Sequence, residues 1–341
     1  MRQEEYLRKF MEELDDFSQE DKEQIREYFQ EMICDRLEAG ETEEEILKNI
    51  GSPEAAAKKL RSEYTARMEA DDPRVDSSQN YGKEKQSRAE YGVFCSGKEA
   101  QELQFLRVQA ENIKIQVNTV KGNTVRVLFE PREGVDEIRT SEENGGFTFQ
   151  QKIRKLWLFD LLQFGRSCCI TVELPESFCG SVELITKNAK IELENTGMLE
   201  SLKAKTSNAH INMSRVQAGR IWLETSNGKI SVSGAVGGDF HAKSSNGHIV
   251  LEEGDFTENI EIRTSNAAIE VPGISGRNIT LQTSNGAVRG KVQGNISDYD
   301  IESRTSNASS TLPTDMRSGK GRRLKVFTSN GKISIDFARN A

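Results

Sequence analysis

Four stretches of this sequence repeat one pattern: residues 206–213 read TSNAHINM, 225–232 TSNGKISV, 264–271 TSNAAIEV and 328–335 TSNGKISI. The motif asparagine recurs at eight positions: Asn188, Asn208, Asn227, Asn246, Asn266, Asn285, Asn307 and Asn330. Successive steps between them are 20, 19, 19, 20, 19, 22 and 23 residues. A nearly fixed period of this length is typical of a solenoid.

Within one repeat the side chains alternate as in a β-strand. Ile260, Ile262 and Thr264 fall on one face, and Glu261 and Arg263 fall on the other. An asparagine-centred bend follows, and a second short alternating stretch continues over 268–271. Every repeat passes the same bend in the same direction, so the coils must stack in parallel. Because parallel crossovers are strongly right-handed, the sequence predicts a right-handed parallel β-helix of about 20 residues per coil.

The eight asparagines are predicted to form a structural ladder of side-chain amides along one corner of the solenoid. Residues at one position of successive coils lie about 4.8 Å apart, which suits amide-to-amide hydrogen bonds. A catalytic interpretation fails because chemistry needs different groups to converge at one place, whereas these sites are nearly identical.

The solenoid domain is predicted to cover residues 101–341, with regular coils from about residue 181 and weaker coils before it. Residues 69–100 are polar and rich in turn formers, which predicts a flexible linker. The apolar segment near residue 160 breaks the pattern. It predicts either a short helix or loop covering the solenoid, or an exposed interaction patch made by Trp157, Leu158, Phe159, Leu161, Leu162 and Phe164.

Residues 1–68 carry the signals of an acidic helical bundle. Leu7, Phe10, Met11 and Leu14 share one helical face. Thr42 followed by Glu45 has the spacing of a capping box, which predicts another helix start. Residues 1–72 hold 22 acidic and 11 basic side chains, a net charge of −11, whereas the rest of the chain carries +3. We therefore expect no direct binding of nucleic acid by this half.

The cysteines and the hydropathy indicate a protein of a reducing compartment. Five cysteines are an odd and sparse set, which suits free thiols better than a disulfide framework. The charged N-terminus does not resemble a signal peptide, and no apolar run reaches the length of a membrane span. The expected location is the cytoplasm, with a surface location left open.

No catalytic or metal-binding pattern emerges. The three histidines (His210, His241 and His248) lack metal-ligand spacing, and neighbouring Cys168 and Cys169 on a strand would point to opposite faces. No phosphate-binding glycine loop precedes a helix. We therefore expect no enzyme, no cofactor and no metal.

The helical part resembles the HAAS family through residues 5–7, 28–31, Gly40, 50–53 and Ala56–Ala57. That family is associated with helix-turn-helix regulators of the PadR type, so the resemblance implies a protein partner, such as a PadR-like transcriptional regulator, for residues 1–68. The recurring T-S-N-G-x-I-x-V is similar to a bacterial β-strand-repeat family described as adhesins, over roughly residues 100–341.

These features favour a non-enzymatic binding and signalling protein. In it, a helical partner-binding domain is tethered to a β-solenoid that serves recognition or self-association. Two alternatives are a polymer-forming structural protein similar to bactofilins, and a surface adhesin. Because the sequence ends soon after the last predicted strand, we also expect homo-oligomers formed through an uncovered C-terminal coil.

Overall fold

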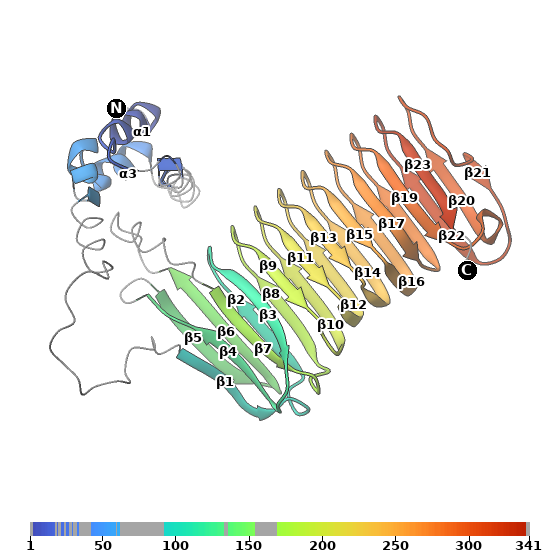
Figure 1. The fold of residues 1–341 in the computed structure, drawn as a ribbon, viewed down its shortest axis with the longest axis horizontal. Helices are drawn as coiled ribbons and strands as arrows, with labels where there is room; N and C mark the ends of the chain where they lie inside the picture. The colour runs from blue at the N-terminus through green and yellow to red at the C-terminus, as the bar shows by residue number, and fades with distance from the viewer. Residues whose placement is uncertain are drawn as a thin grey trace, which may run out of the picture. The chain divides into compact units, whose positions relative to one another are not determined.

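The computed structural model describes residues 3–17, 42–58, 60–61, 92–132, 136–153 and 169–338, and residues 19, 22, 23, 25, 26, 29 and 33 (Figure 1). The N-terminal part contains helices α1 (Gln3–Glu12) and α3 (Glu43–Ile50). Stacked aromatic rings form its centre, with both Tyr6 and Phe10 5.4 Å from Phe29 between ring centroids. The predicted inward face of α1 is buried, and the Thr42 capping box is present.

The β-domain consists of two parallel rows of strands, and Figure 1 shows them stacked along the length of the domain. The even-numbered row runs, in spatial order, β6 (Gly146–Ile153), β2 (Phe105–Gln109), β8 (Ser181–Ile185), β10 (Met198–Lys205), β12 (Gln217–Glu224), β14 (Val236–Lys243), β16 (Gly254–Arg263), β18 (Asn278–Gln282), β22 (Arg322–Phe327) and β20 (Tyr299–Arg304).

The odd-numbered row completes each coil. It runs β7 (Cys169–Pro175), β3 (Lys114–Val120), β9 (Ile191–Glu194), β11 (Ile211–Ser214), β13 (Ile230–Ser233), β15 (Ile249–Glu252), β17 (Ile269–Ser275), β19 (Val288–Gln293) and β23 (Ile333–Ala338). Inward side chains such as Ile211 and Leu223 are fully buried between the rows. This confirms the predicted mainly β solenoid with a small helical N-terminal part.

The beginning of the β-domain is less regular. Strands β1 (Gly92–Glu99) and β4 (Thr124–Phe129) pair antiparallel with each other, and β4 pairs antiparallel with β7. Strand β5 (Asp136–Glu143) precedes β6. Because β1 pairs with β4, the β-domain begins inside the range 69–100 that the sequence analysis assigns to a linker.

The Thr-Ser-Asn corner joins neighbouring coils through side chains as well as backbone. The amide of Asn208 donates to Oδ1 of Asn188 at 2.6 Å, and the same bond recurs up the stack with distances of 2.6–2.8 Å. The buried Thr225 hydroxyl donates to the carbonyl oxygens of Ser207 and Ala209 in the preceding coil, both at 3.3 Å. The corner is therefore a continuous hydrogen-bonded column.

The glycine that follows some motif asparagines reflects how closely the coils approach. A methyl group at Gly228 would collide with the carbonyl oxygen of Ala209 in the coil before it. The opposite corner of the coil needs a left-handed residue instead, supplied by Asn195, Arg215 and Glu253 with φ of 51–53° and by Gly234 with φ of 63°. Two fixed corners keep the coils in one register.

The last coil in the sequence is not the last coil in the stack. Strand β22 pairs in parallel with β18 on one side and with β20 on the other, although β20 comes earlier in the chain. After β20, residues 309–312 read SSTL and are followed by Pro313. This mostly polar segment is poorly suited to pair with β19, whose inward positions need apolar neighbours, and proline cannot donate a ladder hydrogen bond. Ile333 and Ile335 match those positions well, and β23 pairs with β19 instead.

The skipped segment covers the strand edges at this end. Strand β21 (Asp315–Met316) pairs antiparallel with β20. Thr311 Oγ1 accepts a hydrogen bond from the Ile335 N–H at 3.0 Å and donates to the Ile335 carbonyl at 3.1 Å. The expectation that the last coil of the chain is uncovered is therefore wrong, because both of its strands meet residues 299–316 of the same chain. Homo-oligomers through this coil stay a prediction from sequence.

An ion-pair group links three successive strands of the even-numbered row. The buried carboxylate of Glu183 on β8 accepts from Arg107 Nε on β2 at 2.6 Å and lies 2.8 Å from Lys203 Nζ on β10. Burial acts to raise the pKa of Glu183. The hydrogen bonds from Lys203 and Arg107 outweigh it, so the pKa lies below its ordinary value.

We predict that Asn246→Ala lowers the free energy of unfolding by about 1 to 2 kcal/mol, because two ladder hydrogen bonds are lost. Urea titration followed by circular dichroism measures the change. Asn212→Ala is the matched control, since Asn212 has no side-chain hydrogen bond to any described residue. Equal destabilisation by the two substitutions would contradict a stabilising ladder.

Thr311→Val keeps the side-chain shape but removes the hydroxyl that covers the Ile335 edge. We predict faster hydrogen exchange at the Ile335 amide and a loss of about 1 kcal/mol in the free energy of unfolding. Thr314→Val serves as the control, because only the backbone of Thr314 bonds to β20. Unchanged protection at Ile335 would show that the hydroxyl does not cover this edge.

Glu183→Gln should destabilise the fold in a pH-dependent way. A carboxyl group with a lowered folded-state pKa stabilises the fold above its unfolded pKa, and this stabilisation is lost as pH falls through the folded pKa. The difference in urea midpoint between wild type and Glu183→Gln should therefore be large at neutral pH and shrink below the ordinary glutamate pKa of about 4.3. The control Glu194→Gln removes an exposed carboxylate, so its urea midpoint should match that of wild type at both neutral and acidic pH.

Candidate functional site

The predicted ladder asparagines all lie at one corner and bond to one another. Their spatial order differs from the chain order at the end, where Asn330 bonds to Asn285 and Asn307 bonds to Asn330. Asn112 adds an unpredicted rung, since its Oδ1 accepts from the Asn188 amide at 2.8 Å. The signal for Asn112 is the alternation of Ile113, Ile115 and Val117 directly after it.

The predicted interaction patch of Trp157, Leu158, Phe159, Leu161, Leu162 and Phe164 lies outside the described residues. It stays a prediction from sequence.

The three histidines lie apart and each contacts different groups. His210 Nδ1 accepts from the Lys229 N–H at 2.8 Å, and His241 Nδ1 lies 3.1 Å from Glu261 Oε2. Burial lowers the pKa of His248, against the opposing charge of Glu270. Over the described parts of the chain, no three His, Cys, Asp or Glu side chains cluster as metal ligands.

Cys169 and Cys179 are free thiols in the described β-domain. Burial raises the pKa of Cys169, which disfavours the thiolate form needed for nucleophilic or redox chemistry. Cys179 is exposed, and Cys168 lies outside the described residues.

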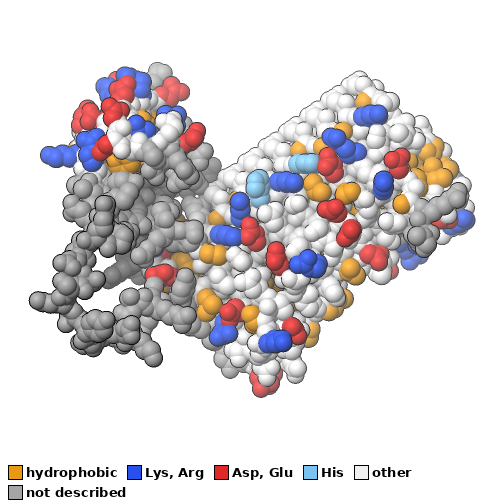
Figure 2. Space-filling view, viewed as in Figure 1, with side chains coloured by type: hydrophobic (Ala, Val, Ile, Leu, Met, Phe, Trp, Pro, Cys, Tyr) orange, Lys and Arg blue, Asp and Glu red, His pale blue; other side chains and the backbone are white. Residues whose placement is uncertain are grey.

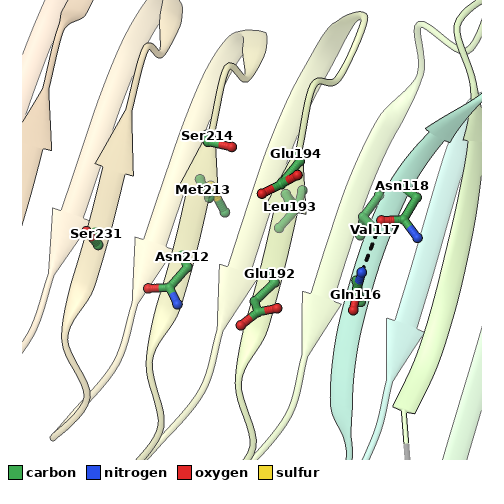
Figure 3. A pocket seen from close by; sticks show the side chains of 10 residues that line it. All are labelled: Gln116, Val117, Asn118, Glu192, Leu193, Glu194, Asn212, Met213, Ser214 and Ser231. Carbon is green, nitrogen blue, oxygen red and sulfur yellow. Dashed lines mark hydrogen bonds between the residues drawn. The ribbon is translucent and has the colours of Figure 1, made fainter.

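A shallow groove of about 330 Å³ lies on the outward side of the odd-numbered row (Figure 3). Its outward side chains come from four neighbouring strands: Gln116 and Asn118 from β3, Glu192 and Glu194 from β9, Asn212 and Ser214 from β11, and Ser231 from β13. Figure 3 shows these polar side chains projecting from neighbouring strands, with Gln116 bonded to Asn118. The Ser214 hydroxyl is buried and has no hydrogen-bond partner among the residues that the structure describes.

This groove offers amides, hydroxyls and carboxylates. Glu192 is already paired with Lys114 at 2.6 Å. Neither histidine nor cysteine lines the groove. Such a surface can hold a polar ligand by hydrogen bonds.

The even-numbered row presents a flat outward face on which Trp222 stands out. Its side chain is 44% exposed and stacks on the His241 ring, with 3.8 Å between centroids. The sequence analysis passes over this residue. The available signal is its place between the buried Ile221 and Leu223, which puts a large apolar ring on the solvent side of β12. Figure 2 shows charged side chains of both signs along the visible face of the solenoid.

A second groove lies on the helical part along α1. Leu7 and Met11 form its apolar floor, and the charged residues Glu4, Arg8, Glu12, Asp15 and Arg26 surround it. Arg8 and Glu12 pair across one helical turn at 2.7 Å. An apolar floor with a charged rim is typical of helix-in-groove recognition.

The described residues contain no helix that is both long and apolar enough to span a membrane.

Comparisons with known proteins match the two parts of the chain separately. Residues 5–59 match the HAAS family. No curated protein matches the chain. A crystal structure of a proposed cell adhesion protein from Clostridium sporogenes aligns with 72% of this chain and 98% of its own, at 9% sequence identity and a TM-score of 0.25. A likeness this low supports no argument about fold or function.

The larger match falls on the β-domain, over residues 98–339, which is more than half of the sequence. Neither family description names an enzymatic activity. The chain belongs to the Toastrack family, DUF4097, and carries a HAAS domain at its N-terminal end.

Proposed function

We propose that this is a non-enzymatic binding and signalling protein. Its HAAS domain binds a protein partner, and its Toastrack solenoid supplies a recognition surface. The observation that carries the proposal is the groove along α1, where Leu7 and Met11 lie between charged side chains. The polar groove on the odd-numbered row supports recognition of a ligand by the solenoid.

The charge of the helical part indicates what kind of partner surface would complement it. Residues 1–72 carry a net charge of −11, so a partner helix with a basic rim and two apolar anchors complements the groove. A PadR-like transcriptional regulator is the partner that we propose, with the contact made to protein and not to DNA. The solenoid would then hold the ligand whose binding is reported to that regulator.

Binding of the full chain to a purified PadR-like regulator from the same genome, measured by isothermal titration calorimetry, tests the proposal. We predict that Glu12→Lys on the groove rim weakens binding about fivefold to tenfold, equivalent to roughly 1 kcal/mol. Glu44→Lys makes the same charge change at an exposed position that does not line the groove.

The salt dependence of the binding affinity gives a second test of the charged rim. Wild-type affinity is expected to fall with added salt, because rim charges contribute by long-range attraction. Equal affinities for Glu12→Lys and Glu44→Lys would exclude the α1 groove as the contact. No binding at all would overturn the partner assignment.

A further inference from the structure

The outward face of strands β10 to β16 contains the most exposed large aromatic residue of the described structure, Trp222. The two grooves described above lie elsewhere, on the odd-numbered row and along α1. A small ligand needs a concave site to be held. A flat face with an exposed tryptophan instead suits a macromolecular partner, since tryptophan and arginine dominate interface energies.

The register of β12 and β14 sets charges side by side on this face. Arg220 lies beside Asp239, Trp222 beside His241, and Glu224 beside Lys243. One strand further out on each side, Lys203 on β10 neighbours Trp222, and Glu261 on β16 neighbours His241. Lys203 and Glu261 therefore lie at equal distances from the line midway between β12 and β14. Like the three pairs on β12 and β14, they join opposite charges or two rings across this line.

This arrangement is complementary to itself. A two-fold rotation about an axis parallel to the strands, midway between β12 and β14, exchanges the members of each pair. It brings Arg220 opposite Asp239 of a second copy, and Lys203 opposite Glu261 of that copy. We propose that a second copy of this chain docks face to face on the even-numbered row, with the Trp222–His241 stack at the centre.

The charged side chains of the face support this occupant. Arg220 and Lys243 form no ion pair within the described structure, so both are available to a partner carboxylate. The rotation also sets Lys205 opposite Arg263, two like charges. Each of these is already neutralised within its own chain, Lys205 by Glu224 at 3.4 Å and Arg263 by Glu261 at 2.5 Å.

The size of the face sets the expected affinity. Counted over the six strands from β8 to β18, which are spaced about 4.8 Å apart and carry three outward residues each, the face covers roughly 600 Å² per copy. This is the low end for specific interfaces, so we expect micromolar self-association. The strand edges at the C-terminal end are covered by residues 309–316, which leaves the face and not that end as the surface for a second copy.

Sedimentation equilibrium of the full chain, from about 1 to 200 µM, tests the proposal. The wild type should approach a dimer as concentration rises. Trp222→Ala should weaken the dimer at least tenfold. Lys291→Asp, an exposed charge reversal on the odd-numbered row, should leave it unchanged. A wild type that stays monomeric throughout would overturn the proposal.

Two charge reversals locate the face. Arg220→Asp alone and Asp239→Arg alone each place like charges opposite one another in a homodimer, so each variant should be monomeric. Mixed in equal amounts, they restore two opposite-charge contacts and should form a heterodimer. This recovery excludes misfolding as the cause of the monomers. If the single variants stay dimeric, or if the mixture stays monomeric, the dimer does not use this face.

Discussion

The close approach of successive coils at the Thr-Ser-Asn corner is the constraint on which the rest of this structure depends. There, an asparagine amide reaches the asparagine of the coil before it, and a buried hydroxyl reaches that coil's carbonyl groups. Because one residue of slip would turn every outward side chain inward, this corner also fixes which residues face solvent. The column of amides thus determines both the core and the outer faces.

That regularity explains why the repeat itself carries no special chemistry. Each amide is occupied by its neighbours, and each motif hydroxyl bonds to the backbone. Recognition therefore falls to what varies from coil to coil on the outward faces. The polar groove across β3 to β13 and the aromatic stack on β12 and β14 are two such departures, on opposite rows of one scaffold. The helical domain contributes a third surface of a different kind, apolar at its floor.

Periodicity and capping signals predict much of this fold from sequence. The alternation around Asn266 predicts buried and exposed faces, and Thr42 with Glu45 predicts the start of α3. The insertion of β22 between β18 and β20 could not be predicted, because each of the three strands alternates equally well. The one sequence signal is the mismatch of residues 309–312 with the buried positions of β19, and its meaning is clear only once the pairing of β22 and β23 is known. Trp222 likewise needed the pairing register before its neighbours on the face could be known.

The position of β22 also has a consequence for folding during translation. A ribosome releases β20 before β22, so during synthesis the free edge of β18 is first available to a strand that does not occupy it in the finished protein. Strand β20 must leave or be kept from that edge until β22 arrives to fill the place between them. The chain cannot therefore complete its coils in the order in which they are translated.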